Sequence, residues 1–208
     1  MKKTLVALGA AAAVVAPVVA LAPRAEVLRP DGVETLEDAI GACRDTGLQG
    51  WDLVDHAIDL VARKYSKYSL WHLWESPRTS FAHSRGYSNK YNVALAIVLR
   101  GLGFRVRTVH AARVQGFGQP WWRAGHTWLL VTHDGQTRDA CASRVGNRTG
   151  ELGFTPLSDE LSVRPITGVG IACALAPIVV WHVWKAWLTG RPVSSTIYRD
   201  FDRREARA

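Results

Sequence analysis

Three residues in this chain have the types and order of a nucleophile, a general base and an orienting acid. Ser88 begins a helical pattern after Gly86-Tyr87, His126 opens a strand-like pattern, and Asp139 follows the next turn. A serine hydroxyl becomes a nucleophile when a histidine accepts its proton and a carboxylate fixes the tautomer of the ring. Such a group would attack an amide or ester carbonyl.

Periodic patterns predict the elements that would position these residues. Apolar residues recur every three or four positions in three stretches, which indicates amphipathic helices. Beyond Gly103 the period falls to two, which indicates strands, and Asp134-Gly135 is a hairpin signal. The patterns predict an α+β domain with N-terminal helices, a central helix and an antiparallel sheet. The predicted helices are 33–43, 51–65 and 88–103, the predicted strands are 104–110, 126–132 and 137–142, and residues 68–85 are expected to be irregular.

The order of these pieces resembles the transglutaminase-like superfamily, whose fold is similar to that of papain-type cysteine proteases. The resemblance covers residues 51–145 and rests on five pieces in sequence: Gly86-Tyr87-Ser88, Leu99-Arg100-Gly101-Leu102-Gly103, the strand 104–109, His126-Thr127-Trp128, and Asp139 after Asp134-Gly135. In that family a catalytic cysteine begins the central helix. The resemblance therefore implies a catalytic position at Ser88, a base at His126 and an orienting partner at Asp139, with serine in place of cysteine.

The serine limits what this arrangement can do. A thiolate at a helix start is stabilised by free backbone N–H groups and the helix dipole, which lower its pKa. A dipole effect of about 1 kcal/mol does not ionise a hydroxyl, so Ser88 needs His126 as a true general base. Cys141 lies on the same strand face as Asp139, and its thiol is an alternative candidate nucleophile. It is not at a helix start, so the sequence shows nothing that would lower its pKa.

Each candidate residue also has a structural interpretation. Ser88 suits a helix N-cap, His126 a hydrogen-bonding strand residue, and Asp139 an exposed strand end. With Asp134-Gly135 as a two-residue turn, Asp139 lies opposite Leu130, four residues along from His126. That offset is about 13 Å in a flat ladder, so twist or a bulge must close it before the carboxylate reaches the ring.

Two apolar runs frame the central domain, residues 24–165. Thr4–Pro23 carries no charge and follows Lys2-Lys3, which predicts a signal peptide or an uncleaved membrane anchor over residues 1–23. The second run, Ile166–Trp184, has 19 uncharged residues, enough to cross about 30 Å of hydrocarbon. It predicts a transmembrane helix over 166–188 and a basic cytoplasmic tail over 189–208; a buried core helix is the alternative.

Charge and aromatic residues agree with a membrane location. Residues 24–165 hold 18 basic and 15 acidic side chains, so the formal net charge of +8 is concentrated beside the apolar runs. This distribution favours basic membrane flanks over a nucleic-acid footprint. Three tryptophans at 181, 184 and 187 resemble an interfacial belt. The sequence predicts a cell-membrane protein with its main domain on the extracytoplasmic side and no nucleic-acid partner.

The cysteines leave two interpretations open. Cys43 and Cys141 would either form a disulfide or remain structural thiols, and Cys173 lies within the second apolar run. The chain has no Cys-x-x-Cys pair, and neither a metal nor a cofactor is predicted. Trp121-Trp122 would wall a substrate cleft or pack in the core.

Three hypotheses for function follow. The leading one is a membrane-anchored, transglutaminase-like domain that has lost cysteine-type acyl transfer and whose cleft binds peptide, protein or amide ligands. The second is an active hydrolase or acyltransferase that uses Ser88, His126 and Asp139. The third is a structural membrane protein in which the triad pattern is accidental.

Overall fold

The structure, a computed structural model, describes residues 2–116 and 125–201, without the side chains of residues 2–10 and 165. It is an α+β fold, as the sequence predicts. The helical elements are α1 (Lys2–Ala20), η1 (Pro30–Gly32), α2 (Leu36–Asp45), α3 (Gly50–Lys64), α4 (Pro77–Ala82), α5 (Ser88–Gly101) and α6 (Pro165–Thr189). The strands are β1 (Lys67–Ser69), β2 (Arg85–Gly86), β3 (Arg105–Ala111), β4 (Val114–Gly116), β5 (His126–His133), β6 (Gln136–Ala140), β7 (Phe154–Pro156), β8 (Glu160–Ser162) and β9 (Tyr198–Asp200).

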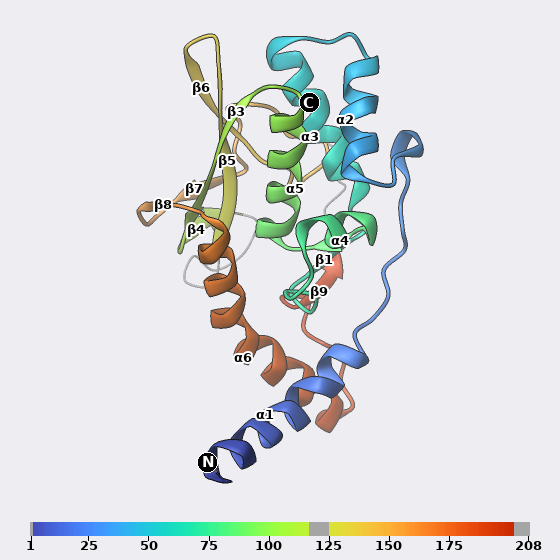
Figure 1. Cartoon of the computed structure of the whole chain (residues 1–208), viewed down its shortest axis with the longest axis vertical. Helices are drawn as coiled ribbons and strands as arrows, with labels where there is room; N and C mark the ends of the chain where they lie inside the picture. The colour runs from blue at the N-terminus through green and yellow to red at the C-terminus, as the bar shows by residue number, and fades with distance from the viewer. Residues whose placement is uncertain (1, 117–124, 202–208) are drawn as a thin grey trace.

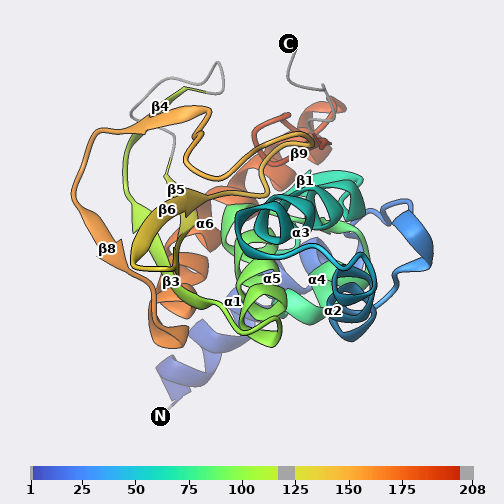
Figure 2. The ribbon, with the colours of Figure 1, turned by 90° about the horizontal axis from the view of Figure 1, so that it is seen from above.

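The central sheet has the strand order β6-β5-β3-β8, and its neighbours are antiparallel. Beside it, β4 pairs with β7, and β2, β1 and β9 form a separate three-stranded sheet. Helices α2, α3 and α5 lie together next to the central sheet (Figures 1 and 2). Leu95 and Leu99 of α5 pack with Leu129 and Val131 of β5 in the main core. This contact fixes the central helix on one face of the sheet.

The three predicted helices are present as α2, α3 and α5. Their apolar faces pack together, and α2 begins with a capping box in which Thr35 Oγ1 accepts the Asp38 N–H at 3.1 Å. Helix α5 ends before Gly103, whose φ of +94° suits a residue without Cβ. The predicted hairpin is also confirmed, because Asp139 pairs with Leu130 across β5 and β6.

The segment 68–85 is more ordered than expected. It contains helix α4 and, at its two ends, strands β1 and β2. The prediction of an irregular segment is therefore wrong. These elements have two to six residues, which is too short to display a helical or strand period in the sequence.

Helix α6 is the one described helix that is long and apolar enough to cross a membrane by length and composition. It lies beside α1 at one end of the molecule, away from α2 and α3 (Figure 1). After α6 the chain returns to the domain, because β9 pairs with β1 and Phe201 packs in the main core. The stretch expected to form a separate tail thus joins the domain as far as Phe201. Residues 202–208 lie outside the described part.

Candidate functional site

Ser88 lies in the first turn of α5. Tyr87 is the N-cap residue, so Ser88 is not the cap that its position in the sequence suggested, and no side chain among the described residues caps this helix. Ser88 is buried, with 6% of its surface exposed. Its hydroxyl therefore lies in the turn whose backbone N–H groups have no partner within the helix.

His126 is paired with Cys141. The imidazole Nε2 lies 3.3 Å from the Cys141 Sγ, and both side chains are buried. The ring of Phe154 packs against the imidazole at a centroid distance of 4.5 Å, and Tyr91 of α5 lies 6.4 Å away on the same measure. The residue that meets His126 is thus the cysteine that was only the second candidate for the nucleophile.

Asp139 holds a tryptophan instead. Its Oδ1 accepts a hydrogen bond from Trp128 Nε1 at 2.8 Å. On the shared sheet face, Asp139 is diagonal to Trp128, and Cys141, two residues on, is diagonal to His126. The β5–β6 pairing is regular, so no twist or bulge brings the Asp139 carboxylate to His126. Among the described residues, no hydrogen bond joins any two of Ser88, His126 and Asp139.

Asn92 connects the central helix to β5 and to the segment that directly follows β6. It is fully buried one turn after Ser88. Its Nδ2 donates to the Thr127 carbonyl at 2.6 Å and lies 3.5 Å from Cys141 Sγ, while its Oδ1 accepts the Ala142 N–H at 2.9 Å. Asn92 belongs to none of the sequence motifs described above. The available signal was an amide at the i+4 position from Ser88, on a helix face that is otherwise largely apolar.

Burial keeps the His126–Cys141 pair uncharged. Loss of water, followed by the positive charge that His110 would contribute, lowers the pKa of His126 to about 3. Burial also raises the pKa of the Cys141 thiol above its ordinary value, against hydrogen bonds to Ser143 and Asn92 that act in the other direction. At neutral pH the site therefore holds a thiol and a neutral imidazole. A thiolate–imidazolium pair, which activates a catalytic cysteine, is disfavoured here.

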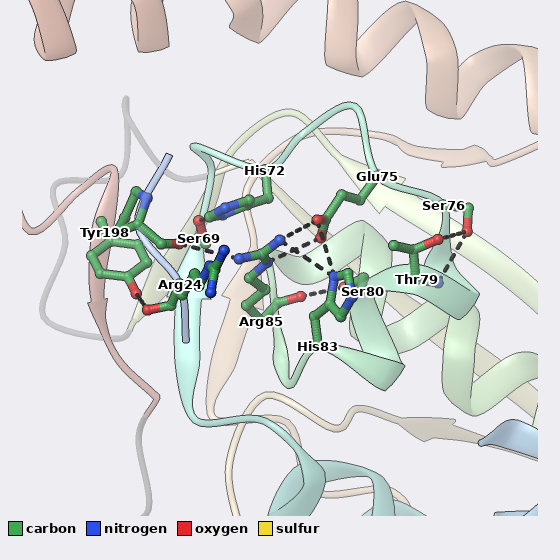
Figure 3. A network of polar contacts seen from close by, with 11 residues as sticks. Arg24, Ser69, His72, Glu75, Ser76, Thr79, Ser80, His83, Arg85 and Tyr198 are labelled. Carbon is green, nitrogen blue, oxygen red and sulfur yellow. Dashed lines mark hydrogen bonds and ion pairs between the residues drawn. The ribbon is translucent and has the colours of Figure 1, made fainter. Parts of the chain in front are cut away.

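A second polar cluster lies just before the start of α5 (Figure 3). Arg85 Nη2 donates to Glu75 Oε1 at 2.5 Å, and Arg85 Nη1 donates to the Pro23 carbonyl at 3.1 Å. Burial would raise the pKa of Glu75, but the hydrogen bond and charge of Arg85 outweigh it and lower that pKa. The cluster fastens the lead-in segment near residue 23 to Arg85 of β2, which lies three residues before Ser88. The chain that leads into α5 is therefore held by polar contacts on both sides of Arg85.

The described surface also has a hollow at the far end of the sheet. It is bounded by the start of α3, the α5–β3 turn and the β5–β6 hairpin, and it includes Gly50, Phe104 and His133. Because His126 begins β5 and His133 ends it, this hollow is separated from the candidate site by the length of the strand. Trp121-Trp122, the predicted cleft wall, lies outside the described residues.

The cysteines are unpaired in the described structure. Cys43 is in the main core, Cys141 lies in the cluster around Trp128 and Phe154, and Cys173 is exposed on α6. The disulfide interpretation of Cys43 and Cys141 is therefore not realised. Among the described residues, no group of three or more His, Cys, Asp or Glu side chains could hold a metal ion.

Together these features define an α+β domain with a buried Cys–His–Asn cluster between a central helix and an antiparallel sheet. No protein-family model matches the sequence, and no curated protein is significantly similar to it. The geometry of this cluster is therefore the basis for a functional assignment.

Proposed function

We propose that this chain is a membrane-associated protein with a transglutaminase-like domain that has lost cysteine-type acyl transfer and that binds peptide or amide ligands. The observation that carries the proposal is the 3.3 Å contact between His126 Nε2 and Cys141 Sγ in a buried, uncharged setting. The His126 nitrogen that would activate a nucleophile contacts the Cys141 thiol instead, and this thiol is itself not activated. The helix start holds a serine, which the dipole cannot ionise.

The arrangement of elements supports the family assignment within this proposal. The central helix packs against an antiparallel sheet, the histidine begins one strand, and the next strand returns through a tight hairpin. These are the parts on which the sequence resemblance rests. Asn92 links the helix to β5 and to the segment directly after β6, so the cluster also has a structural role that does not need catalysis.

An active serine hydrolase or acyltransferase is the second candidate. The Asn92–Thr127 hydrogen bond favours it, because this bond holds the helix turn after Ser88 against the residue that follows His126. In this mechanism His126 would take the Ser88 proton while the hydroxyl oxygen attacks an acyl carbon, and would return the proton to the leaving group. His126 would first have to exchange Cys141 for Ser88, and Asp139 would have to release Trp128.

Labelling of the full-length protein in detergent separates these functions. We would treat wild type, Ser88→Ala and Cys141→Ala with a fluorophosphonate and, separately, with iodoacetamide, and measure intact mass. The proposal expects no fluorophosphonate adduct and alkylation of Cys141 only after unfolding. Stoichiometric fluorophosphonate labelling that disappears in Ser88→Ala would overturn it in favour of the serine enzyme. Fast alkylation of native Cys141 would overturn it in favour of a cysteine nucleophile.

The ligand-binding part needs its own measurement. Binding of a library of fluorescent peptides and peptide amides would be followed by anisotropy for wild type and for Ser88→Trp, in which the helix start is blocked. Saturable binding that Ser88→Trp abolishes supports the proposal. If no peptide binds to a folded wild type, the structural membrane protein remains and the ligand-binding role is rejected.

A further inference from the structure

Both ends of α6 are attached to the same domain. Just before the helix, β8 pairs with β3 of the central sheet, and Val163 N donates to the Thr108 carbonyl at 2.8 Å. After the helix, β9 pairs with β1, and Phe201 packs with Tyr65 and Tyr91 in the main core. A helix that crosses a bilayer delivers its ends to opposite sides. Here the two ends reach one folded unit.

One face of α6 packs against the domain along the helix. Near its start, Gly168 lies close to Asn89 of α5: a Cβ atom added at this glycine would be in van der Waals contact with Asn89 Oδ1, at 3.6 Å. Further along, Val179 and Val183 are buried with Trp71 and Tyr87. Near its end, Trp187 packs against Trp71 with the ring centroids 6.3 Å apart. This inner face therefore contacts protein near its start, along its middle and near its end, and its side chains are half-buried or buried.

The opposite face of α6 is apolar and exposed. Lys185 and Thr189 are exposed, and the exposed apolar side chains are Ile166, Val169, Cys173, Ala174, Pro177, Ile178, Trp181 and Leu188. Within the helix the only charged residue is Lys185. Helix α1 lies alongside, with Trp184 Nε1 donating to the Val14 carbonyl at 2.9 Å, and it adds exposed Val15 and Val19. A soluble protein rarely exposes two adjacent helices of this composition.

We propose that α1 and α6 seat the protein in one face of a lipid bilayer, with α6 lying along the surface and the domain and the β9 strand on the same side. A transmembrane position for α6 would require β9 to leave the domain, or the domain residues beside the inner face, Asn89 among them, to enter hydrocarbon, where unsatisfied polar groups are costly. An in-plane position needs neither. It leaves the inner face on the domain and places the outer face among acyl chains.

The chemistry of the surroundings selects lipid as the partner. Arg164 precedes α6, Lys185 lies in its last turns, and Arg191 follows it, all three exposed. Basic side chains beside the exposed apolar face can bind anionic headgroups, and exposed Trp181 suits the interface between headgroups and acyl chains. The same seating places the candidate site near the bilayer, because Tyr87, which directly precedes Ser88, is buried against α6.

Side-specific labelling tests the topology. In full-length protein with Cys173→Ser, exposed reporters would be introduced one at a time as Thr155→Cys on the domain and Ser195→Cys after α6. The proteins would be reconstituted in sealed vesicles and treated with a membrane-impermeant maleimide before and after detergent. The proposal expects the two reporters to react to the same extent before detergent. Reaction of one reporter before detergent and of the other only afterwards would overturn it.

The membrane contact itself is tested on the outer face. Native Cys173 would carry an environment-sensitive fluorophore, and vesicles containing anionic lipid would carry quenchers at shallow or deep acyl positions. We expect stronger quenching from the shallow position; stronger quenching from the deep position, or no vesicle binding, would overturn the proposal. Trp181→Glu should weaken vesicle binding roughly tenfold, a loss of about 1.4 kcal/mol. Leu157→Glu, an equally drastic change on the exposed domain surface, should leave binding unchanged. Equal binding by both variants would reject the outer face as the contact.

Discussion

At the scale of single residues, Asn92 supports the cluster more than any of the three residues selected from the sequence. Its amide serves Thr127, Cys141 and Ala142, which belong to two segments that meet it from the sheet. A buried side chain with this many partners leaves several polar groups unsatisfied when it is removed. Asn92, next to the His126–Cys141 pair, is thus also expected to stabilise the fold.

We expect Asn92→Ala to lower the free energy of unfolding by about 2–4 kcal/mol, because the Thr127 carbonyl and the Ala142 N–H remain buried without partners. Denaturant unfolding of the full-length protein in detergent measures this change. Asn89→Ala is the matched control on the same helix, since the Asn89 Nδ2 makes no hydrogen bond within the described structure. Its cost should be below about 1 kcal/mol. Equal losses for the two variants would contradict the role of Asn92.

Asp139 offers a second test at this scale. If its carboxylate mainly holds Trp128, Asp139→Asn keeps an oxygen acceptor and should change stability little, whereas Asp139→Ala should cost about 1–2 kcal/mol. Both variants would be compared by thermal unfolding and by Trp128 fluorescence. A carboxylate that orients a catalytic histidine would behave differently, because Asp139→Asn would then abolish any fluorophosphonate labelling while preserving stability.

The neutral state of His126 predicts how stability depends on pH. Its pKa is about 3 in the folded chain against an ordinary value of 6.5, so between these values the unfolded chain binds a proton that the folded chain does not. Stability therefore rises with pH through this window and is lost on acidification below 6.5, by about 1 kcal/mol per pH unit. His72, whose pKa burial lowers to about 4, acts in the same direction.

Unfolding free energies at pH 7, 6 and 5 would measure this slope. His126→Gln, which cannot titrate, should show a shallower slope than wild type over the same range. His133→Gln is the control, because that ring is partly exposed at the hairpin end of the same strand. A slope in His126→Gln equal to that of wild type would show that His126 is not the neutral buried group described above.

At the scale of elements, the sequence predicted those whose pattern repeats over several turns or residues. The apolar spacing of Val54, Ile58 and Val61 identified α3, and the alternation around Trp128 and Leu130 identified β5. Strands such as β8 and β9 have three residues each, and their pairing depends on partners roughly 50 and 130 positions away. No local pattern specifies such contacts.

The candidate site was predicted only in part for a related reason. Alternation correctly placed Asp139 and Cys141 on one face, and the turn correctly paired Asp139 with Leu130. Which of the two reaches His126 depends on the diagonal offset across the ladder and on the packing of Asn92 from α5. These are tertiary contacts, so the sequence alone left the choice open and the family pattern pointed to Asp139.

The strand β9 illustrates how a terminal element can be essential to the core. Phe201 has 5% of its surface exposed and packs with the rings of Tyr65 and Tyr91. We expect Phe201→Ala to cost about 3–4 kcal/mol, as for other buried aromatic residues. Tyr198→Phe, which keeps the ring and loses only a 3.4 Å hydrogen bond to the Arg24 carbonyl, is the control and should cost much less. A small effect of Phe201→Ala would show that the chain after α6 does not dock on the domain.

At the scale of the whole molecule, α1 is integrated into the structure. Val18 is buried with Val179 and Val183 of α6, and its carbonyl accepts a hydrogen bond from Trp71 Nε1 at 2.7 Å. The lead-in after α1 is then held by Arg85 through the Pro23 carbonyl. A segment that satisfies buried donors in the domain is part of the fold. We therefore favour the uncleaved anchor over the signal peptide as the form of residues 1–22.

Removal of residues 1–22 tests this integration. The truncated protein loses the partner of Trp71 Nε1 and uncovers the α6 residues that pack on Val18, so its melting temperature in detergent should fall by several degrees. Trp71→Phe, which loses only the hydrogen bond within an otherwise complete chain, should lie between the truncated protein and wild type. Intact mass of protein purified from membranes should also show that residues 1–22 are retained. A truncated chain as stable as wild type, together with a mass that lacks these residues, would instead assign α1 to a removable signal peptide and leave α6 alone to hold the protein at the membrane.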